Sequence, residues 1–152
     1  MPLYFAYGSN MDLAAMSVRC PRSRALGPAR LIGHRVFITR DGYASVMREP
    51  GRLVWGLLWD LALTDVPALD HYESLGTGLY AKVIRPVITD RGPRRAMIYV
   101  GRRREAGLPK PGYVEGIVAA AAQAGLPDVY LRELQAGLPT GSPDRTFAQS
   151  RR

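Results

Sequence analysis

The sequence has 152 residues, 47% hydrophobic and 22% charged, which is enough for one compact domain and too little for two full ones. Its apolar stretches are shorter than the roughly 20 residues that span a bilayer, and residues 1–20 lack a basic segment followed by an apolar run, so we expect no membrane role and no secretory signal. The net charge of +8 permits nucleic-acid contact, but no zinc-ligand spacing or RNA-binding signature accompanies the arginines, so we expect a solvated basic surface that attracts small anions.

The first half of the chain is predicted to be mostly strands. Four are expected, over residues 3–7, 30–39, 43–47 and 53–59. The two middle ones flank Asp41-Gly42, a hairpin turn signal, and the last follows Pro50-Gly51. A short helix is predicted over residues 12–18.

Helices and a second hairpin are predicted in the other half. A helix over residues 64–74 begins at Thr64, a suitable N-cap, with Pro67 early enough to be tolerated. Strands follow over residues 80–89 and 95–100, then helices over residues 111–124 and 127–136, with Gly125 between the two helices as a left-handed residue.

These elements predict an α+β fold. We expect a small, mixed and mostly antiparallel β-barrel of about six strands, flanked by about four helices. The domain is predicted to span residues 1–139, and residues 140–152, which are poor in apolar side chains, are predicted to form a flexible tail.

The cysteine and histidine content argues against disulfides and metals. Cys20 is the only cysteine, so it cannot form an internal disulfide, and we expect an inert, packed thiol in a cytoplasmic protein. His34 and His71 are the only histidines and no cysteines cluster near them, so we expect no catalytic metal.

Glu73 is the strongest catalytic candidate. On the helix from Thr64, a rotation of 100° per residue places it on the face of Ala62, Val66 and Leu69, so a carboxylate lies within an apolar stripe. If this stripe packs on the sheet, desolvation raises the pKa of Glu73 toward the range of a general base near neutral pH. The alternatives are a glutamate that turns out to water or a structural partner of an arginine.

The turn Tyr7-Gly8-Ser9-Asn10 is the second candidate. It follows a predicted buried strand and precedes a predicted helix, so several backbone N–H groups are expected to point into one concavity that holds an anion or polarises a carbonyl. The alternative is an ordinary strand-ending turn with a helix cap. Ser9 is a poor nucleophile candidate because no Gly-x-Ser-x-Gly motif surrounds it.

Residues 3–11, Leu-Tyr-Phe-Ala-Tyr-Gly-Ser-Asn-Met, resemble the opening signature of the γ-glutamylcyclotransferase family, which includes the AIG2-like proteins. Further similar segments follow in the family's order: Pro50-Gly51, Val54-Trp55-Gly56-Leu57-Leu58-Trp59, Leu69-Asp70 with Glu73, Gly78-Leu79-Tyr80, and the segment from Tyr113 through Gly125-Leu126-Pro127 to Tyr130 and Leu134. The resemblance covers nearly the whole chain up to about residue 138.

The resemblance implies a small barrel enzyme without metal or organic cofactor. Its implied reaction cyclises a γ-glutamyl amide to 5-oxoproline and releases an amino acid or amine, with Glu73 as general base and acid. The implied substrate-binding residues are Tyr4, Phe5, Ala6, Tyr7, Gly8, Ser9, Asn10, Tyr80 and Tyr113. A homodimer is also an expectation from the family.

One departure from the family leaves the substrate open. The family commonly has Glu-Gly-Val where this sequence has Glu73-Ser74-Leu75, so a side chain stands beside the base on the leaving-group side. Two alternatives from other classes remain: a non-catalytic protein of the same fold that binds a small metabolite, and a basic module associated with nucleic acid.

Overall fold

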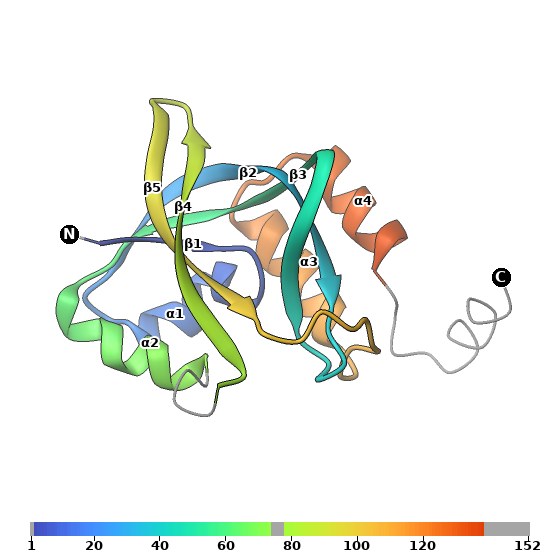
Figure 1. The fold of residues 1–152 in the computed structure, drawn as a ribbon. Coiled ribbons are helices and arrows are strands. Elements are labelled where there is room, and N and C mark those ends of the chain that lie inside the picture. The colour runs from blue at the N-terminus through green and yellow to red at the C-terminus, as the bar shows by residue number, and fades with distance from the viewer. Residues whose placement is uncertain (1, 74–77, 139–152) are drawn as a thin grey trace, which may run out of the picture.

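The computed structural model describes residues 2–73 and 78–138 of the chain (Figure 1). Its elements in chain order are β1 (Leu3–Ala6), η1 (Ser9–Met11), α1 (Leu13–Arg19), β2 (Arg24–Ile38), β3 (Ala44–Asp60), η2 (Leu63–Asp65), α2 (Val66–Tyr72), β4 (Tyr80–Thr89), β5 (Gly92–Gly101), α3 (Tyr113–Gln123) and α4 (Asp128–Gly137). The predicted tail and the Ser74 substitution lie outside the described residues. None of the helices among these residues has the length and apolar character needed to cross a membrane.

The five strands close into a barrel in the order β1-β3-β2-β4-β5. β1 is antiparallel to β3 and parallel to β5, and the other neighbours are antiparallel, so the predicted mixed, mostly antiparallel barrel is confirmed. Figure 1 shows α1 and α2 together on one side of the barrel and α3 and α4 on the other. The turn after β1 and the end of α2, which carry the candidate residues, therefore lie on the α1–α2 side of the barrel.

The prediction of about six strands was wrong because the two strands predicted over residues 43–47 and 53–59 are one, β3. Along β2, Ile32 pairs with Leu53 of β3, and His34, two residues later, pairs with Arg48. Residues 49–52 of β3 therefore stand opposite a single residue of β2, Gly33. This is an enlarged bulge: the chain bends, with Gly51 at φ +86°, and then resumes its pairing with the same strand.

The helix that carries Glu73 is shorter than predicted. Thr64 does not cap it, because Thr64 lies inside the preceding 3₁₀ turn η2, and Asp65 occupies the N-cap position without a side-chain cap bond. The Asp65 carboxylate instead accepts hydrogen bonds from the Arg22 amide at 3.0 Å and the Ser23 hydroxyl at 2.8 Å. These bonds tie the start of α2 to the segment after α1. The early Pro67 is tolerated, as predicted.

The barrel interior is filled by apolar side chains from every strand. Phe5, Val54, Val87 and Ile98 are fully buried. Gly56 lies where the Phe5 ring crosses β3, and a Cβ at position 56 would stand 2.6 Å from that ring. The close approach of β1 to β3, which fixes the start of the Tyr7–Asn10 turn, therefore depends on a glycine.

Candidate active site

Glu73 forms the C-cap of α2 and faces the turn that follows β1. Its amide donates to the Leu69 carbonyl at 2.9 Å, and Leu69 is fully buried, so the helix end is held against the barrel. Its Oε1 accepts hydrogen bonds from Asn10 Nδ2 at 3.3 Å and, more weakly, from the Tyr4 hydroxyl at 3.5 Å. Glu73 was predicted within an apolar stripe of a helix that runs to residue 74; in the structure it lies just past Tyr72, the last residue of α2.

The surroundings of Glu73 change its acidity. Burial raises the pKa of Glu73 from 4.5 to about 7, while the positive charge of Arg19 and the hydrogen bond from Tyr4 act in the opposite direction. A carboxyl with this pKa is present in both protonation states near neutral pH. It can therefore accept a proton and return it within one reaction cycle.

Asn10 connects Glu73 to the positive charge of Arg19. An Arg19 guanidinium nitrogen donates to Asn10 Oδ1. Because a guanidinium only donates, this contact directs the Asn10 amide nitrogen toward Glu73 and toward the Tyr4 hydroxyl at 3.0 Å. The Trp59 indole donates to the Asn10 carbonyl at 3.2 Å and fixes the backbone. The Asn10 side chain is buried, and its hydrogen bonds hold its amide nitrogen in place as a donor to Glu73.

The turn after β1 offers free backbone donors. In η1, the amides of Met11 and Asp12 donate to the carbonyls of Gly8 and Ser9, both at 3.1 Å. Within the part of the chain that the structure describes, the amides of Gly8, Ser9 and Asn10 have no acceptor. These three N–H groups are therefore available as donors to a bound oxygen or anion. That they hold one stays a prediction.

Five tyrosines surround the carboxylate, four of them buried and Tyr113 half-buried, from β1, its following turn, β4, β5 and α3: Tyr4, Tyr7, Tyr80, Tyr99 and Tyr113. Burial raises the pKa of every one of them, so their hydroxyls stay neutral. The backbone of Ala44 holds two of them: its carbonyl accepts from Tyr80 at 2.8 Å, and its amide donates to Tyr113 at 2.9 Å. The Tyr113 hydroxyl therefore retains a proton that it can donate into the cavity.

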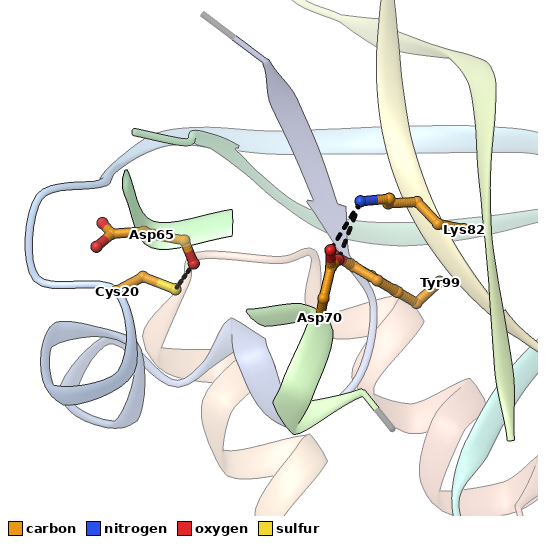
Figure 2. A network of polar contacts seen from close by, with 5 residues as sticks. All are labelled: Cys20, Asp65, Asp70, Lys82 and Tyr99. Atoms are coloured by element: carbon orange, nitrogen blue, oxygen red, sulfur yellow. Dashed lines mark hydrogen bonds and ion pairs between the residues drawn. The ribbon is translucent and has the colours of Figure 1, made fainter. Parts of the chain in front are cut away.

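A polar network ties the catalytic helix to β4 and β5 (Figure 2). The Tyr99 hydroxyl donates to the carboxylate of Asp70, which also pairs with Lys82 Nζ at 3.0 Å. The backbone carbonyl of Tyr99 accepts from the Tyr7 hydroxyl at 2.5 Å. Asp70 lies one helical turn before Glu73, so this network fixes the orientation of the end of α2, and with it the Glu73 carboxylate, relative to the sheet.

Two adjoining cavities meet at Glu73. The inner one, about 30 Å³, is lined by eight of the ten predicted site residues and by two others: Tyr4, Tyr7, Gly8, Ser9, Asn10, Glu73, Tyr80 and Tyr113, with Ala44 and Tyr99. The outer one, about 170 Å³, shares Ser9, Glu73, Tyr80 and Tyr113 and adds Tyr43, Tyr72 and Leu79. Phe5 and Ala6 line neither: Phe5 lies in the barrel interior and Ala6 pairs with β3.

Cys20 lies outside this site. Its thiol is buried, and burial and the nearby Asp65 raise its pKa to about 11, which agrees with the prediction of an inert thiol (Figure 2). Among the described residues, no three His, Cys, Asp or Glu side chains are grouped in a way that would hold a metal ion.

Comparison with known proteins places the chain among related sequences. A model of the AIG2-like family matches residues 53–134, more than half of the chain. Proteins named gamma-glutamylcyclotransferase from human and cattle are 29% and 30% identical over 145 and 143 residues, which cover 88% and 87% of this chain and 77% and 76% of those proteins. The chain belongs to the γ-glutamylcyclotransferase/AIG2-like family.

Solved structures extend the family likeness to the fold. A protein named gamma-glutamyl cyclotransferase superposes with a TM-score of 0.85 at 26% identity over 99% of each chain. A human protein superposes with a TM-score of 0.83 at 28% identity over 96% of each chain. The γ-glutamylcyclotransferase-like barrel predicted from the sequence is therefore confirmed.

For this member of the γ-glutamylcyclotransferase/AIG2-like family, the sequence did not reveal several residues around the cavity. Tyr99 and Ala44 reach it from β5 and β3, and Arg19 acts behind Asn10 from the end of α1. Arg19 also stacks on the Tyr72 ring, with its Cζ 3.4 Å from the ring centroid. The sequence shows that side chains alternate between the two faces of the strand that contains Tyr99. It does not show which of these faces meets α2.

Proposed function

We propose that this protein is a γ-glutamylcyclotransferase, which converts a γ-glutamyl amide to 5-oxoproline and a free amino acid or amine. The observation that carries the proposal is Glu73, a carboxyl with a pKa of about 7 that faces three free backbone amides across a small cavity. The family relationship to proteins named gamma-glutamylcyclotransferase supports this choice of reaction.

The reaction is an intramolecular acyl transfer. Glu73 takes a proton from the substrate's α-ammonium, and the free amine attacks the γ-carbonyl and closes a five-membered lactam. The ring nitrogen then loses its second proton to solvent, and the C–N bond to the leaving group breaks as Glu73 returns the first proton to the leaving nitrogen, so no water is consumed. Intramolecular attack removes much of the entropic barrier once the glutamyl chain is folded.

The turn amides stabilise the negative charge of the transition state. Attack on the γ-carbonyl places charge on its oxygen, and fixed N–H donors at that oxygen are worth roughly 10² to 10³ in rate. The amides of Gly8, Ser9 and Asn10 are the free donors of the cavity wall. Asn10 also fixes the Glu73 carboxylate through its side chain.

The two cavities suggest where each part of the substrate lies. The inner cavity, about 30 Å³, has room for only a few atoms, so it suits the γ-carbonyl beside the free amides. The outer cavity is lined by Tyr43, Tyr72 and Leu79 in addition to shared residues, so it suits the leaving amine. Its aromatic wall favours a leaving group with apolar surface.

A substrate panel tests the proposal. We expect purified protein to release 5-oxoproline from γ-glutamyl-alanine or from another γ-glutamyl amino acid or amine. The isomer α-glutamyl-alanine and N-acetyl-γ-glutamyl-alanine should give none, because the first has an unactivated γ-carboxylate and the second has no free nucleophile. Release of glutamate in place of 5-oxoproline would identify a hydrolase.

The Glu73→Gln variant tests the role of the base. Loss of general acid–base catalysis should lower kcat by roughly 10² to 10⁴. The matched control is Glu115→Gln, which removes an exposed carboxylate on α3 and should leave kcat unchanged. Full activity of Glu73→Gln would refute the assignment, and saturable substrate binding without turnover by the wild type would favour a binding protein.

A further inference from the structure

A second, wider cavity among the described residues is separate from the Glu73 site. It has a volume of about 550 Å³ and shares no lining residue with either cavity at Glu73. Side chains alternate along β4: Tyr80 faces the Glu73 site, while Ala81, Val83 and Arg85 line the large cavity. The two sites thus lie on opposite faces of the β4–β5 hairpin.

The cavity exists because two hairpins diverge. β2 and β4 pair only at Arg30 and Ile88, and beyond that point β2 continues with β3 as a two-stranded arm. In Figure 1 this arm diverges from the β4–β5 hairpin. Side chains of both hairpins line the cavity. The bulge at Gly33 bends the arm at its base.

The lining combines an apolar floor with a basic rim. Buried side chains from both hairpins form the floor: Leu31, Phe37, Val46 and Ile98. Exposed arginines and one histidine form the rim: His34, Arg48, Arg85, Arg102 and Arg104. No carboxylate lines the cavity, and the ion pairs formed among the described residues do not use any of these four arginines.

We propose that this cavity, which we call the arm cavity, binds a small amphipathic oxyanion, with its apolar body on the floor and its carboxylate or phosphate head at the arginines. Arginine binds planar and tetrahedral oxyanions through paired N–H donors. A volume of about 550 Å³ is in the usual range for a small-molecule site, roughly 300 to 1,000 Å³. The proposal does not depend on the activity at Glu73.

The shape of the site favours a small ligand over a polynucleotide. Single-stranded nucleic acid binds along extended basic grooves with several aromatic side chains for base stacking. Here the arginines come from both hairpins around one concavity, and the only ring side chains in its lining are Phe37 and His34. An apolar floor of this kind matches an alkyl or aryl body.

Calorimetric titration with octyl phosphate tests the arm cavity. We expect saturable one-to-one binding that is at least about tenfold tighter than binding of inorganic phosphate, which lacks the apolar body, or of octyl glucoside, which lacks the charge. Equal affinity for octyl glucoside, or no saturable binding of octyl phosphate, would overturn the proposal. Binding of a thymidine 12-mer in its place would assign the surface to nucleic acid.

Two pairs of substitutions locate the binding. The double variant Arg85→Ala with Arg102→Ala removes two rim charges and should weaken octyl phosphate binding at least about tenfold. The control, Arg91→Ala with Arg95→Ala, removes the same charge from exposed positions of the same hairpin outside the cavity and should leave binding unchanged. An equal effect of both pairs would mean general charge attraction and would overturn the proposal.

A third variant tests the floor without changing charge. Ala81→Leu adds apolar bulk inside the arm cavity, so it should weaken octyl phosphate binding and leave thermal stability close to that of the wild type. Unchanged affinity in Ala81→Leu would contradict a ligand body seated on the floor.

Discussion

At Gly8 a single methyl group would reach the proposed substrate space. Its φ of −123° is allowed for any residue, and a Cβ there would lie 3.6 Å from the Tyr113 hydroxyl and 3.8 Å from the Ala44 Cβ. These are ordinary contacts, so Gly8→Ala should fold. The methyl would occupy much of a cavity of only about 30 Å³.

We therefore expect Gly8→Ala to raise KM at least about tenfold, equivalent to roughly 1.4 kcal/mol of lost binding, with little change in melting temperature. Steady-state kinetics and thermal unfolding measure the two quantities. Gly116→Ala, on an exposed helix position with no neighbour within 4 Å of its Cβ, is the control and should leave KM unaltered. An unaltered KM in Gly8→Ala would remove the turn from the site.

Arg19 sets the acidity of Glu73 from behind Asn10. In the free enzyme, Glu73 acts as base only when deprotonated, so kcat/KM should rise with pH up to about 7 and then level off. Arg19 lowers the pKa of Glu73. Arg19→Gln removes this charge and keeps a donor for Asn10, so the acidic limb of the profile should move to higher pH.

The pH dependence of kcat/KM in wild type and Arg19→Gln checks this expectation. Arg22→Ala, which removes an exposed positive charge nearby without a contact to Asn10, should leave the midpoint in place. A midpoint that falls or stays constant in Arg19→Gln would show that Arg19 does not tune the base.

Local patterns in the sequence made Glu73 and the turn candidates, and the family resemblance then favoured both over their alternatives. An apolar stripe is visible at helical spacing, and a strand followed by glycine and a helix predicts free amides. Tyr99 and Arg19 could not be predicted in this way. Their contacts to Asp70 and Asn10 depend on how α2 and α1 pack on the barrel, which no local pattern encodes.

At the scale of elements, the contact between β1 and β3 places the catalytic turn. A Cβ at Gly56 would lie 2.5 Å from the Ala6 carbonyl and 2.6 Å from the Phe5 ring, too close for either neighbour to remain in place. Gly56→Ala should therefore destabilise the protein by at least about 2 kcal/mol, because the β1–β3 ladder must shift.

Gly116→Ala is the matched substitution in a helix. Its Cβ meets no atom within 4 Å, so it should stabilise α3 by roughly 0.5 to 1 kcal/mol. Urea unfolding of the two variants measures both free energies. The same glycine-to-alanine change should lower the free energy of unfolding at position 56 and raise it at position 116. A change of the same sign at both positions would mean that the close approach of β1 to β3 does not require a glycine.

The strands themselves were predictable to different degrees. Hairpin turns were predicted at Asp41-Gly42 and at residues 90–93, and each has a glycine, Gly42 or Gly92, at positive φ. Gly92 and Pro93 already belong to β5 in the structure. Pro50-Gly51 carries the same local signal but forms a bulge. Only the pairing of Leu53 and Arg48 with the same strand, β2, distinguishes the two outcomes, and that pairing is a long-range property.

At the scale of the whole molecule, the Glu73 site is assembled from segments far apart in the chain. Its hydrogen bonds join Asn10 to Glu73, Tyr7 to Tyr99 and Ala44 to Tyr113, across 63 to 92 residues of sequence. The site therefore exists only when the complete barrel is closed. Conversely, the free-energy cost of burying the Glu73 carboxylate lowers the free energy of unfolding of the whole domain.

This cost makes the stability of the protein depend on pH, because only the ionised form of Glu73 is disfavoured by burial. The pKa of Glu73 is about 7 in the folded protein and near 4.5 without burial, so between these values the folded state binds more protons than the unfolded state. Stability should accordingly fall as pH rises from about 4.5 to 7. The shift corresponds to a loss of up to about 3 kcal/mol above pH 7.

Glu73→Gln removes the ionisation and keeps the shape, so it should be more stable than the wild type by about 1 to 3 kcal/mol at pH 8 and only slightly different at pH 5. Urea unfolding of both proteins at the two pH values measures this. Glu115→Gln, which changes an exposed carboxylate, should show no such difference between pH 5 and pH 8. If Glu73→Gln were no more stable than wild type at pH 8, burial would not be what raises the pKa of Glu73, and the physical basis for its role as a base at neutral pH would be lost.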